Sequence, residues 1–143
     1  GKGTEKVGAI RADLQKAMEA DMQVFRTDET IRAALATIAE LEERYKKISI
    51  QDKGKRFNLD LLEAVELGFL IELAKVMSVG ALHRKESRGG HYREDFPKRD
   101  DVNFMEHSMV YLDPESEFEG VKGLRFETKP VVYTRYEPKE RKY

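Results

Sequence analysis

Apolar residues recur every three or four positions along the first half of the chain, which is the spacing of one face of an α-helix. One such stretch runs from about Thr4 to Met22, and a second runs from about Asp28 to Lys47. A third begins after Asn58, a residue suited to capping a helix, and reaches about Arg84. The first half therefore predicts three antiparallel helices joined by short polar connections.

The third stretch is apolar on most sides, which raises the alternative of a membrane span. Charged residues interrupt it, among them Glu63, Glu66, Glu72 and Lys75. A charge at the middle of a bilayer costs about 2.5–3.5 kcal/mol even on a lenient scale. We therefore expect a central helix that the other two helices cover on one side and a further surface covers on the other.

Strand patterns replace helix patterns in the second half of the chain. The adjacent Gly89 and Gly90 favour a turn, and Met109–Leu112 and Leu124–Thr128 have the character of strands. The two strands can pair as a hairpin whose long acidic loop begins at Asp113, and a proline-containing tail follows.

The predicted fold is mainly α: an antiparallel three-helix bundle, a Gly-rich loop, a small β-hairpin and an extended tail. We expect residues 1–90 to form the bundle. Residues 91–143 would form the loop, hairpin and tail packed on it.

Composition narrows the possible functions. The chain has 143 residues, no cysteine and a net charge of −1, with 37% charged residues. Without cysteine it has no disulfide, no thiolate zinc site and no cysteine ligand for an iron–sulfur cluster. The pI of about 6.4 argues against a general nucleic-acid binder. Because the chain opens without an initiator methionine or an apolar signal segment, we expect a piece of a longer protein.

Candidate chemistry concentrates in residues 84–101, which hold six Lys or Arg residues, two glycines and a histidine. One interpretation is a loop that binds an anion through guanidinium and backbone N–H groups. The other, which composition favours, is an internal network of ion pairs. In that network Arg88, Arg93 and Arg99 would pair with Glu86, Glu94, Asp95, Asp100 and Asp101.

Other catalytic and binding patterns are weak. Ser87, His91 and Asp95 could form a catalytic triad only on a helix, which the glycine pair disfavours. The three histidines, His83, His91 and His107, lie far apart in the sequence. The pairs Glu42–Glu43 and Glu63–Glu66 lack the histidine that a di-metal site needs. The chain has no dinucleotide or phosphate-binding glycine motif. We therefore assign no catalytic, cofactor-binding or metal-binding residue.

Residues 86–101, Glu-Ser-Arg-Gly-Gly-His-Tyr-Arg-Glu-Asp-Phe-Pro-Lys-Arg-Asp-Asp, resemble a signature of one enzyme family. It belongs to the C-terminal region of succinate dehydrogenase and fumarate reductase flavoprotein subunits. The resemblance extends to Val7-Gly8 and Phe25-Arg26, and to the ending from Pro138 to Tyr143. That ending favours succinate dehydrogenase. Fumarate reductase and L-aspartate oxidase, which shares the core of the signature, are the alternatives.

The resemblance implies a parent that binds FAD, interconverts succinate and fumarate, and passes electrons to an iron–sulfur subunit and a quinone. The flavin-binding and capping domains, which carry the substrate residues of the family, are missing here. The expected partners are those missing domains and the iron–sulfur subunit, with no nucleic acid and no direct membrane span. The expected location is cytoplasmic, peripheral to the inner face of the plasma membrane.

The resemblance also suggests a docking role for the loop. We expect a polar network to fix the loop and join it to the flavin domain or the iron–sulfur subunit. Its members would be Ser87, Arg88, Gly89, Gly90, His91, Arg93, Asp95, Arg99, Asp100 and Asp101. A free-standing helical interaction module is the rival from another class, and a nucleic-acid binder ranks last because acidic residues interleave with the basic ones.

Overall fold

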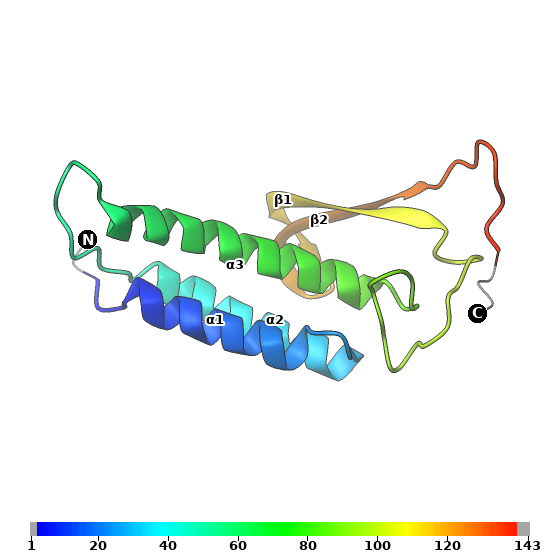
Figure 1. Ribbon diagram of the computed structural model, residues 1–143, viewed down its shortest axis with the longest axis horizontal. Coiled ribbons are helices and arrows are strands. Elements are labelled where there is room, and N and C mark those ends of the chain that lie inside the picture. Colours follow the sequence, from blue (N-terminus) through cyan, green and yellow to red (C-terminus); the bar gives the residue numbers. More distant parts are fainter. Residues whose placement is uncertain (1–2, 140–143) are drawn as a thin grey trace.

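A computed structural model describes residues 3–139 of the chain. The elements in order are α1 (Val7–Asp21), α2 (Asp28–Tyr45), α3 (Leu59–His83), β1 (Glu106–Phe118) and β2 (Val121–Pro130). Figure 1 shows three helices side by side in alternating directions, with the β1–β2 hairpin along the C-terminal half of α3. The prediction of a mainly helical chain with three helices and a hairpin is confirmed.

Local side chains fix where α2 and α3 begin. The Thr27 hydroxyl accepts a hydrogen bond from the Thr30 amide at 3.2 Å, and the Thr30 hydroxyl oxygen accepts one from the Thr27 amide at 3.0 Å. Asn58 Oδ1 accepts from the Leu61 amide at 2.8 Å. These side chains satisfy N–H groups that the first turn of a helix cannot satisfy itself.

The outer helix ends differ slightly from the prediction. α1 begins at Val7 and not at Thr4, because Glu5 lies beside the segment after α2. The Glu5 amide donates to the Lys47 carbonyl at 3.1 Å, and the Glu5 carbonyl accepts from the Ser49 amide at 2.9 Å. α2 ends at Tyr45, and a turn follows it. The start of the described chain is thereby tied to the end of α2.

The core consists of two apolar clusters. One joins α1, α2 and the first two-thirds of α3 through residues such as Ile10, Leu41 and Leu67. The other joins the opposite end of the bundle to the hairpin, where Leu124 of β2 is fully buried beside Leu82 and Ile31. The hairpin therefore packs on the bundle, whereas the division of the chain at residue 90 remains a prediction.

The long acidic loop of the hairpin was predicted wrongly. β1 continues through Asp113 to Phe118, and the two strands meet at a tight turn where Glu119 and Gly120 have φ values of 51° and 78°. The ladder is irregular between Leu112 and Glu117, around Pro114, and then resumes. The sequence Asp113-Pro114-Glu115 has turn character, but Phe118 and Val121 beyond it pack against the core.

The prediction of an α3 covered on both sides was also wrong. α1 and α2 cover one face, and the hairpin covers part of the C-terminal half. A row of large apolar side chains stays exposed on the remaining surface, which we call the outer face of α3. Its members are Leu59, Leu61, Leu62, Val65, Phe69, Leu70, Leu73 and Met77. Within residues 3–139, no helix has the length and apolar content needed to cross a membrane.

Candidate functional site

The charged loop, residues 84–101, lies where three helix ends meet. α1 ends at Asp21, α2 begins at Asp28, and α3 ends at His83. The last carbonyls and first N–H groups of a helix have no partners within the helix, so a place where three ends meet needs outside donors and acceptors. The loop supplies both from its charged side chains.

Arg93 connects the end of α3 to the start of α2. Its side chain is fully buried, and Nη1 donates to the carbonyls of Ala81 and Leu82 at 2.9 and 3.2 Å. Its Nε and Nη2 donate to the two Asp95 oxygens at 2.7 and 2.6 Å. Asp95 Oδ2 also accepts from the Asp28 amide at 2.9 Å. The Arg93 guanidinium holds the pKa of Asp95 at about 2, against the opposing effect of burial.

Glu86 is a second buried charge, with no exposed surface. It accepts from Arg84 at 2.6 Å, from Arg88 at 2.8 and 3.0 Å, and from the Asp100 amide at 2.7 Å. Burial raises the pKa of Glu86, but the hydrogen bonds from Arg88, the Asp100 amide and Arg84 outweigh it, so the pKa lies below its usual value. The carboxylate is therefore ionised and shared between two guanidinium groups.

Arg84 extends the network to the hairpin. Its Nη1 donates to the Phe104 carbonyl at 2.9 Å, and its Nη2 donates to the Glu106 carbonyl at 2.6 Å and to the Ser108 hydroxyl at 3.0 Å. One side chain at the end of α3 therefore positions the first residues of β1.

His91 joins the loop to the end of α1. Its Nδ1 lies 3.1 Å from Arg26 Nη1, and its Nε2 lies 3.0 Å from the Arg84 carbonyl oxygen. Since arginine only donates, these contacts fit a neutral ring with its hydrogen on Nε2. Burial lowers the pKa of His91, and the charges of Arg26, Arg93 and Arg84 lower it further against the hydrogen bond to the carbonyl. Arg26 Nε in turn donates to the Met22 and Gln23 carbonyls at 3.0 and 2.7 Å.

The glycine pair makes the tight turn that the sequence predicts. Arg88 and His91 exchange two backbone hydrogen bonds, of 2.8 and 3.0 Å, around Gly89, whose φ of 60° suits glycine. Ser87 Oγ donates to the Phe96 carbonyl at 2.8 Å and accepts from the Arg93 amide at 2.9 Å. Because Ser87 bonds to backbone and not to His91, the three residues do not form a catalytic triad.

Most of the predicted ion pairs form. Arg88 bonds to Glu86 and, at 2.7 Å, to Asp101, while Arg99 bonds to the other Asp101 oxygen at 2.8 Å. The Asp100 carboxylate instead accepts from the amides of Val102 and Asn103, and the exposed Glu94 contributes its own amide to the Arg26 carbonyl. Gly90 is exposed and has an ordinary φ.

Sequence reasoning missed Arg26 and Arg84, and it treated Glu86 only as an ion-pair partner. Arg26 could have been found from its position just after a helix, because the last carbonyls of a helix have no partner within it and need a donor.

The charged loop is built for structure. Its guanidinium groups bond to its own carboxylates and to backbone carbonyls of α3, β1 and the loop between them, so we assign none of them to a substrate or to a flavin. Among residues 3–139, no three His, Asp or Glu side chains come together as a metal site would require.

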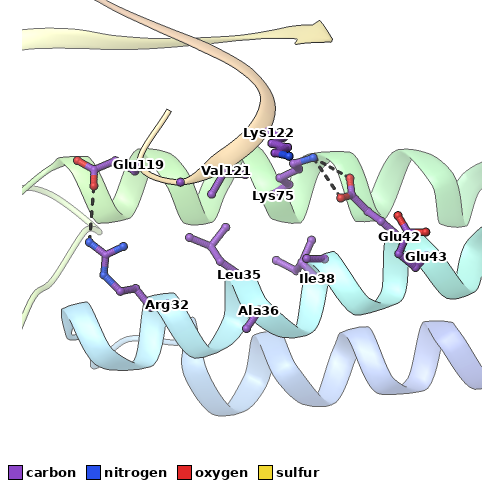
Figure 2. Close-up of a pocket in the computed structure, with 12 residues that line it drawn as sticks. Arg32, Leu35, Ala36, Ile38, Glu42, Glu43, Lys75, Glu119, Val121 and Lys122 are labelled. Atoms are coloured by element: carbon purple, nitrogen blue, oxygen red, sulfur yellow. Dashed lines mark hydrogen bonds and ion pairs between the residues drawn. The ribbon is translucent and has the colours of Figure 1, made fainter. Parts of the chain in front are cut away.

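A hollow of about 500 Å³ lies elsewhere, between α2 and the hairpin turn. Figure 2 shows its two ion pairs, Arg32 with Glu119 and Lys75 with Glu42. Small and apolar side chains such as Ala36 and Val121 form much of the lining. Since both ion pairs are already closed, the lining presents no set of free polar groups converging on a ligand.

Comparison with known proteins assigns the fold to one family. The family model described as "Fumarate reductase flavoprotein C-term" matches residues 11–143. The chain is 36% identical over 142 residues to the fumarate reductase flavoprotein subunit of Haemophilus influenzae, covering 99% of this chain and 23% of that protein. It is 40% identical over 111 residues to the succinate dehydrogenase flavoprotein subunit of Rickettsia conorii, covering 78% of this chain and 19% of that protein.

A solved structure agrees. Quinol fumarate reductase of Escherichia coli superposes with a TM-score of 0.88 at 36% identity, covering 97% of this chain and 23% of that one. The chain thus spans about a quarter of the length of the relatives it matches. It belongs to the family of fumarate reductase and succinate dehydrogenase flavoprotein subunits, and it corresponds to their C-terminal domain.

Proposed function

We propose that this chain is the supporting and docking domain of a flavoprotein that interconverts succinate and fumarate. The observation that carries the proposal is the charged loop itself. It carries the family signature, and its buried charged side chains form hydrogen bonds that join three helix ends and the hairpin. Because these side chains are paired within the chain, we assign the loop a structural role and no catalytic step.

The reaction would take place in the flavin-binding and capping domains, which lie outside this chain. FAD bound there would supply the exchange of a hydride with the substrate. This chain would contribute a rigid body against which those domains are held, and we assign it no catalytic or flavin-contacting residue. Electrons would pass to an iron–sulfur subunit and then to a quinone.

The direction of the parent's reaction is not set by this domain. Relatives named for fumarate reductase and for succinate dehydrogenase match it at 36% and 40% identity. Direction depends on flavin potential and on partner subunits, which act elsewhere. The preference for succinate dehydrogenase rests on the chain ending, whose last residues, 140–143, lie outside the described part, and it stays a prediction.

The location follows from the same proposal. We place the domain on the cytoplasmic side, held at the inner face of the plasma membrane through partner subunits. The ten-residue network would join the rest of the enzyme through its outermost pair, Arg99 and Asp101, because Arg93 and Glu86 are fully buried.

The test is Arg88→Ala in the complete flavoprotein. Arg88 bonds to both Glu86 and Asp101, so its loss should loosen the loop. We expect flavin retention and subunit assembly to fall while the KM for succinate stays within about twofold. Arg32→Ala, which removes two exposed ion pairs, with Asp28 and with Glu119, is the control outside the loop.

A change confined to the KM for succinate would instead make the loop a substrate site and refute the proposal. Sequencing the gene upstream of Gly1 tests the rival interaction module. A dinucleotide-binding glycine motif in the same reading frame supports the flavoprotein, and a start codon near Gly1 supports the module.

A further inference from the structure

We propose that His91 is a pH-sensitive switch: its neutral ring holds the connection between α1 and α2 against the charged loop, and its protonated ring releases that connection. The connection comprises residues 22–27. Figure 1 shows the end of α1, the start of α2 and the end of α3 at the same end of the bundle. The switch is independent of the parent's reaction, so it goes beyond the proposed function.

Both segments contribute neighbouring residues to the contact. Arg26 Nη1 lies 3.1 Å from His91 Nδ1, and the adjacent rings of Phe25 and Tyr92 meet edge to face with their centroids 5.8 Å apart. The Glu94 amide donates to the Arg26 carbonyl at 2.8 Å. Since residues 23–25 are exposed, these contacts hold the middle of the connection to the loop.

The contact with Arg26 requires an unprotonated Nδ1 on His91. An arginine side chain only donates hydrogen bonds, so Nδ1 must accept with its lone pair. The hydrogen of the neutral ring then lies on Nε2, which donates to the Arg84 carbonyl at 3.0 Å. A proton from solvent would bind at Nδ1 and place two N–H donors opposite each other. The bond to Arg26 would be lost and the bond to Arg84 kept, so the ring stays on the end of α3 and the connection is the part that moves.

The charges around His91 reinforce this effect. The ring lies near three guanidinium groups, those of Arg26, Arg84 and Arg93. The acidic partners of the last two, Glu86 and Asp95, bond to the arginines. Burial lowers the pKa of His91 most, and the three positive charges lower it further, against the hydrogen bond to the carbonyl. A protonated ring therefore adds a fourth positive charge to a partly buried group of three.

The switch therefore opens in acid. A released histidine has a pKa of about 6.5, and the closed contact holds the pKa of His91 below that value. The released form thus binds the proton first, and its population grows as pH falls from about 6.5 toward the pKa of the closed form. Arg93 still bonds to the end of α3, and Asp95 still bonds to the Asp28 amide at the start of α2. Only the connection that follows α1 separates from the loop.

Hydrogen exchange of single amides, followed by NMR at pH 5, 6 and 7, tests the switch on the 143-residue chain. The Glu94 amide reports it directly, because its acceptor is the Arg26 carbonyl on the other side of the contact. Relative to the intrinsic rate at each pH, we expect this amide to exchange at least about threefold faster at pH 5 than at pH 7. It should also exchange faster than the amide of the buried Leu67 at every pH, because the connection opens without unfolding the core.

Two substitutions identify the titrating group. In His91→Gln the side chain can accept from Arg26 and donate to the Arg84 carbonyl without titrating, so the protection of the Glu94 amide should be the same at pH 5 and pH 7. His107→Gln, at an exposed position of β1, is the matched control and should keep the wild-type pH dependence. In the wild type, ¹⁵N spectra of the His91 ring at pH 7 should show the hydrogen on Nε2.

Several results would overturn the switch. Equal protection of the Glu94 amide at pH 5 and pH 7 in the wild type, or a pH dependence that survives in His91→Gln, would exclude His91 from this role. Equal exchange of the Glu94 and Leu67 amides would mean that the connection opens only when the whole chain unfolds. A hydrogen on Nδ1 at pH 7 would contradict the contact with Arg26. If His91→Gln does not fold, the wild-type exchange rates and ring spectra still decide.

Discussion

The charged loop and the outer face of α3 differ in which side chains they bury. The loop buries charged side chains, and the outer face exposes apolar ones. The loop buries Arg93 and Glu86 completely and surrounds each with partners inside the chain. The outer face leaves Phe69 and Leu73 in solvent without a cover. The buried charges of the loop are therefore paired within the chain, whereas the apolar packing of α3 is incomplete. We therefore expect substitutions in the buried part of the loop to change the stability of the chain, and substitutions on the outer face of α3 to change it little.

Among the substitutions that test this comparison, Arg93→Met should have the largest effect on the free energy of unfolding. Methionine fills part of the space, but it leaves the Ala81 and Leu82 carbonyls and the Asp95 carboxylate without their donors. Arg93 is buried, but Asp95 is partly exposed and keeps the Asp28 amide, so the main loss is the unpaired carbonyls. A buried acceptor without a donor costs about 1–3 kcal/mol, and for two of them we expect a loss of about 2–5 kcal/mol in the free energy of unfolding in urea. Arg32→Met, at exposed pairs with Asp28 and Glu119, should cost less, about 1 kcal/mol. Equal losses would mean that the loop is not the stabilising region.

Glu86→Gln should have a somewhat smaller effect. The amide keeps the shape of the side chain but places one N–H₂ group among the donors of Arg84 and Arg88. A buried group that loses a charged hydrogen bond costs about 2–3 kcal/mol, measurable as a lower urea midpoint. Glu43→Gln, at an exposed pair with Lys46, is the control and should leave the midpoint nearly unchanged.

The pH dependence of stability sharpens the same contrast. The folded chain holds the pKa of His91 below the value of about 6.5 that an unfolded chain has. The unfolded state therefore takes up a proton first, and the free energy of unfolding should fall as pH drops from about 6.5 toward the folded pKa. Asp95, with a pKa of about 2, adds a second loss as pH falls from about 4 to 2.

Urea unfolding at pH 7, 6 and 5 would measure the first of these losses. His91→Gln can keep both hydrogen bonds without titrating, so it should flatten the slope between pH 7 and 5. His107→Gln, on an exposed part of β1, should leave the slope as it is in the wild type. A slope that survives in His91→Gln would show that His91 is not the group responsible.

The helices were predictable from sequence because the spacing of the apolar residues and the capping residues indicate the same helix boundaries. Asn58 ends a polar connection, begins an apolar stripe and caps α3 as expected, and Thr27 has the same role at α2. The full length of the hairpin was not predictable, since Asp113-Pro114-Glu115 has turn character locally. Only the packing of Phe118 and Val121 on the bundle continues the strands beyond it.

Sequence predicted part of the loop's ion-pair network, but not the members that come from outside it or the geometry. Charge density near the glycine pair indicated an internal network, and Arg88, Arg93 and Arg99 do pair with acidic residues of the loop. Arg26 lies 65 positions before His91 in the sequence, so no local pattern could reveal that contact. Which charges are buried depends on where three helix ends meet, and the tertiary structure alone determines that.

The smallest expected effect belongs to the outer face, where Phe69→Gln should barely change the stability of the 143-residue chain. Phe69 is 60% exposed, so its removal opens no cavity, and glutamine is the better helix former. We expect the free energy of unfolding to change by less than about 0.5 kcal/mol. Leu67→Ala, two positions away and fully buried, should cost about 2–5 kcal/mol. Self-association of the chain, measured by sedimentation, should decrease in Phe69→Gln because an apolar patch shrinks. A large loss of stability in Phe69→Gln would show that this face is packed within the chain, and the contrast between the two regions would then disappear.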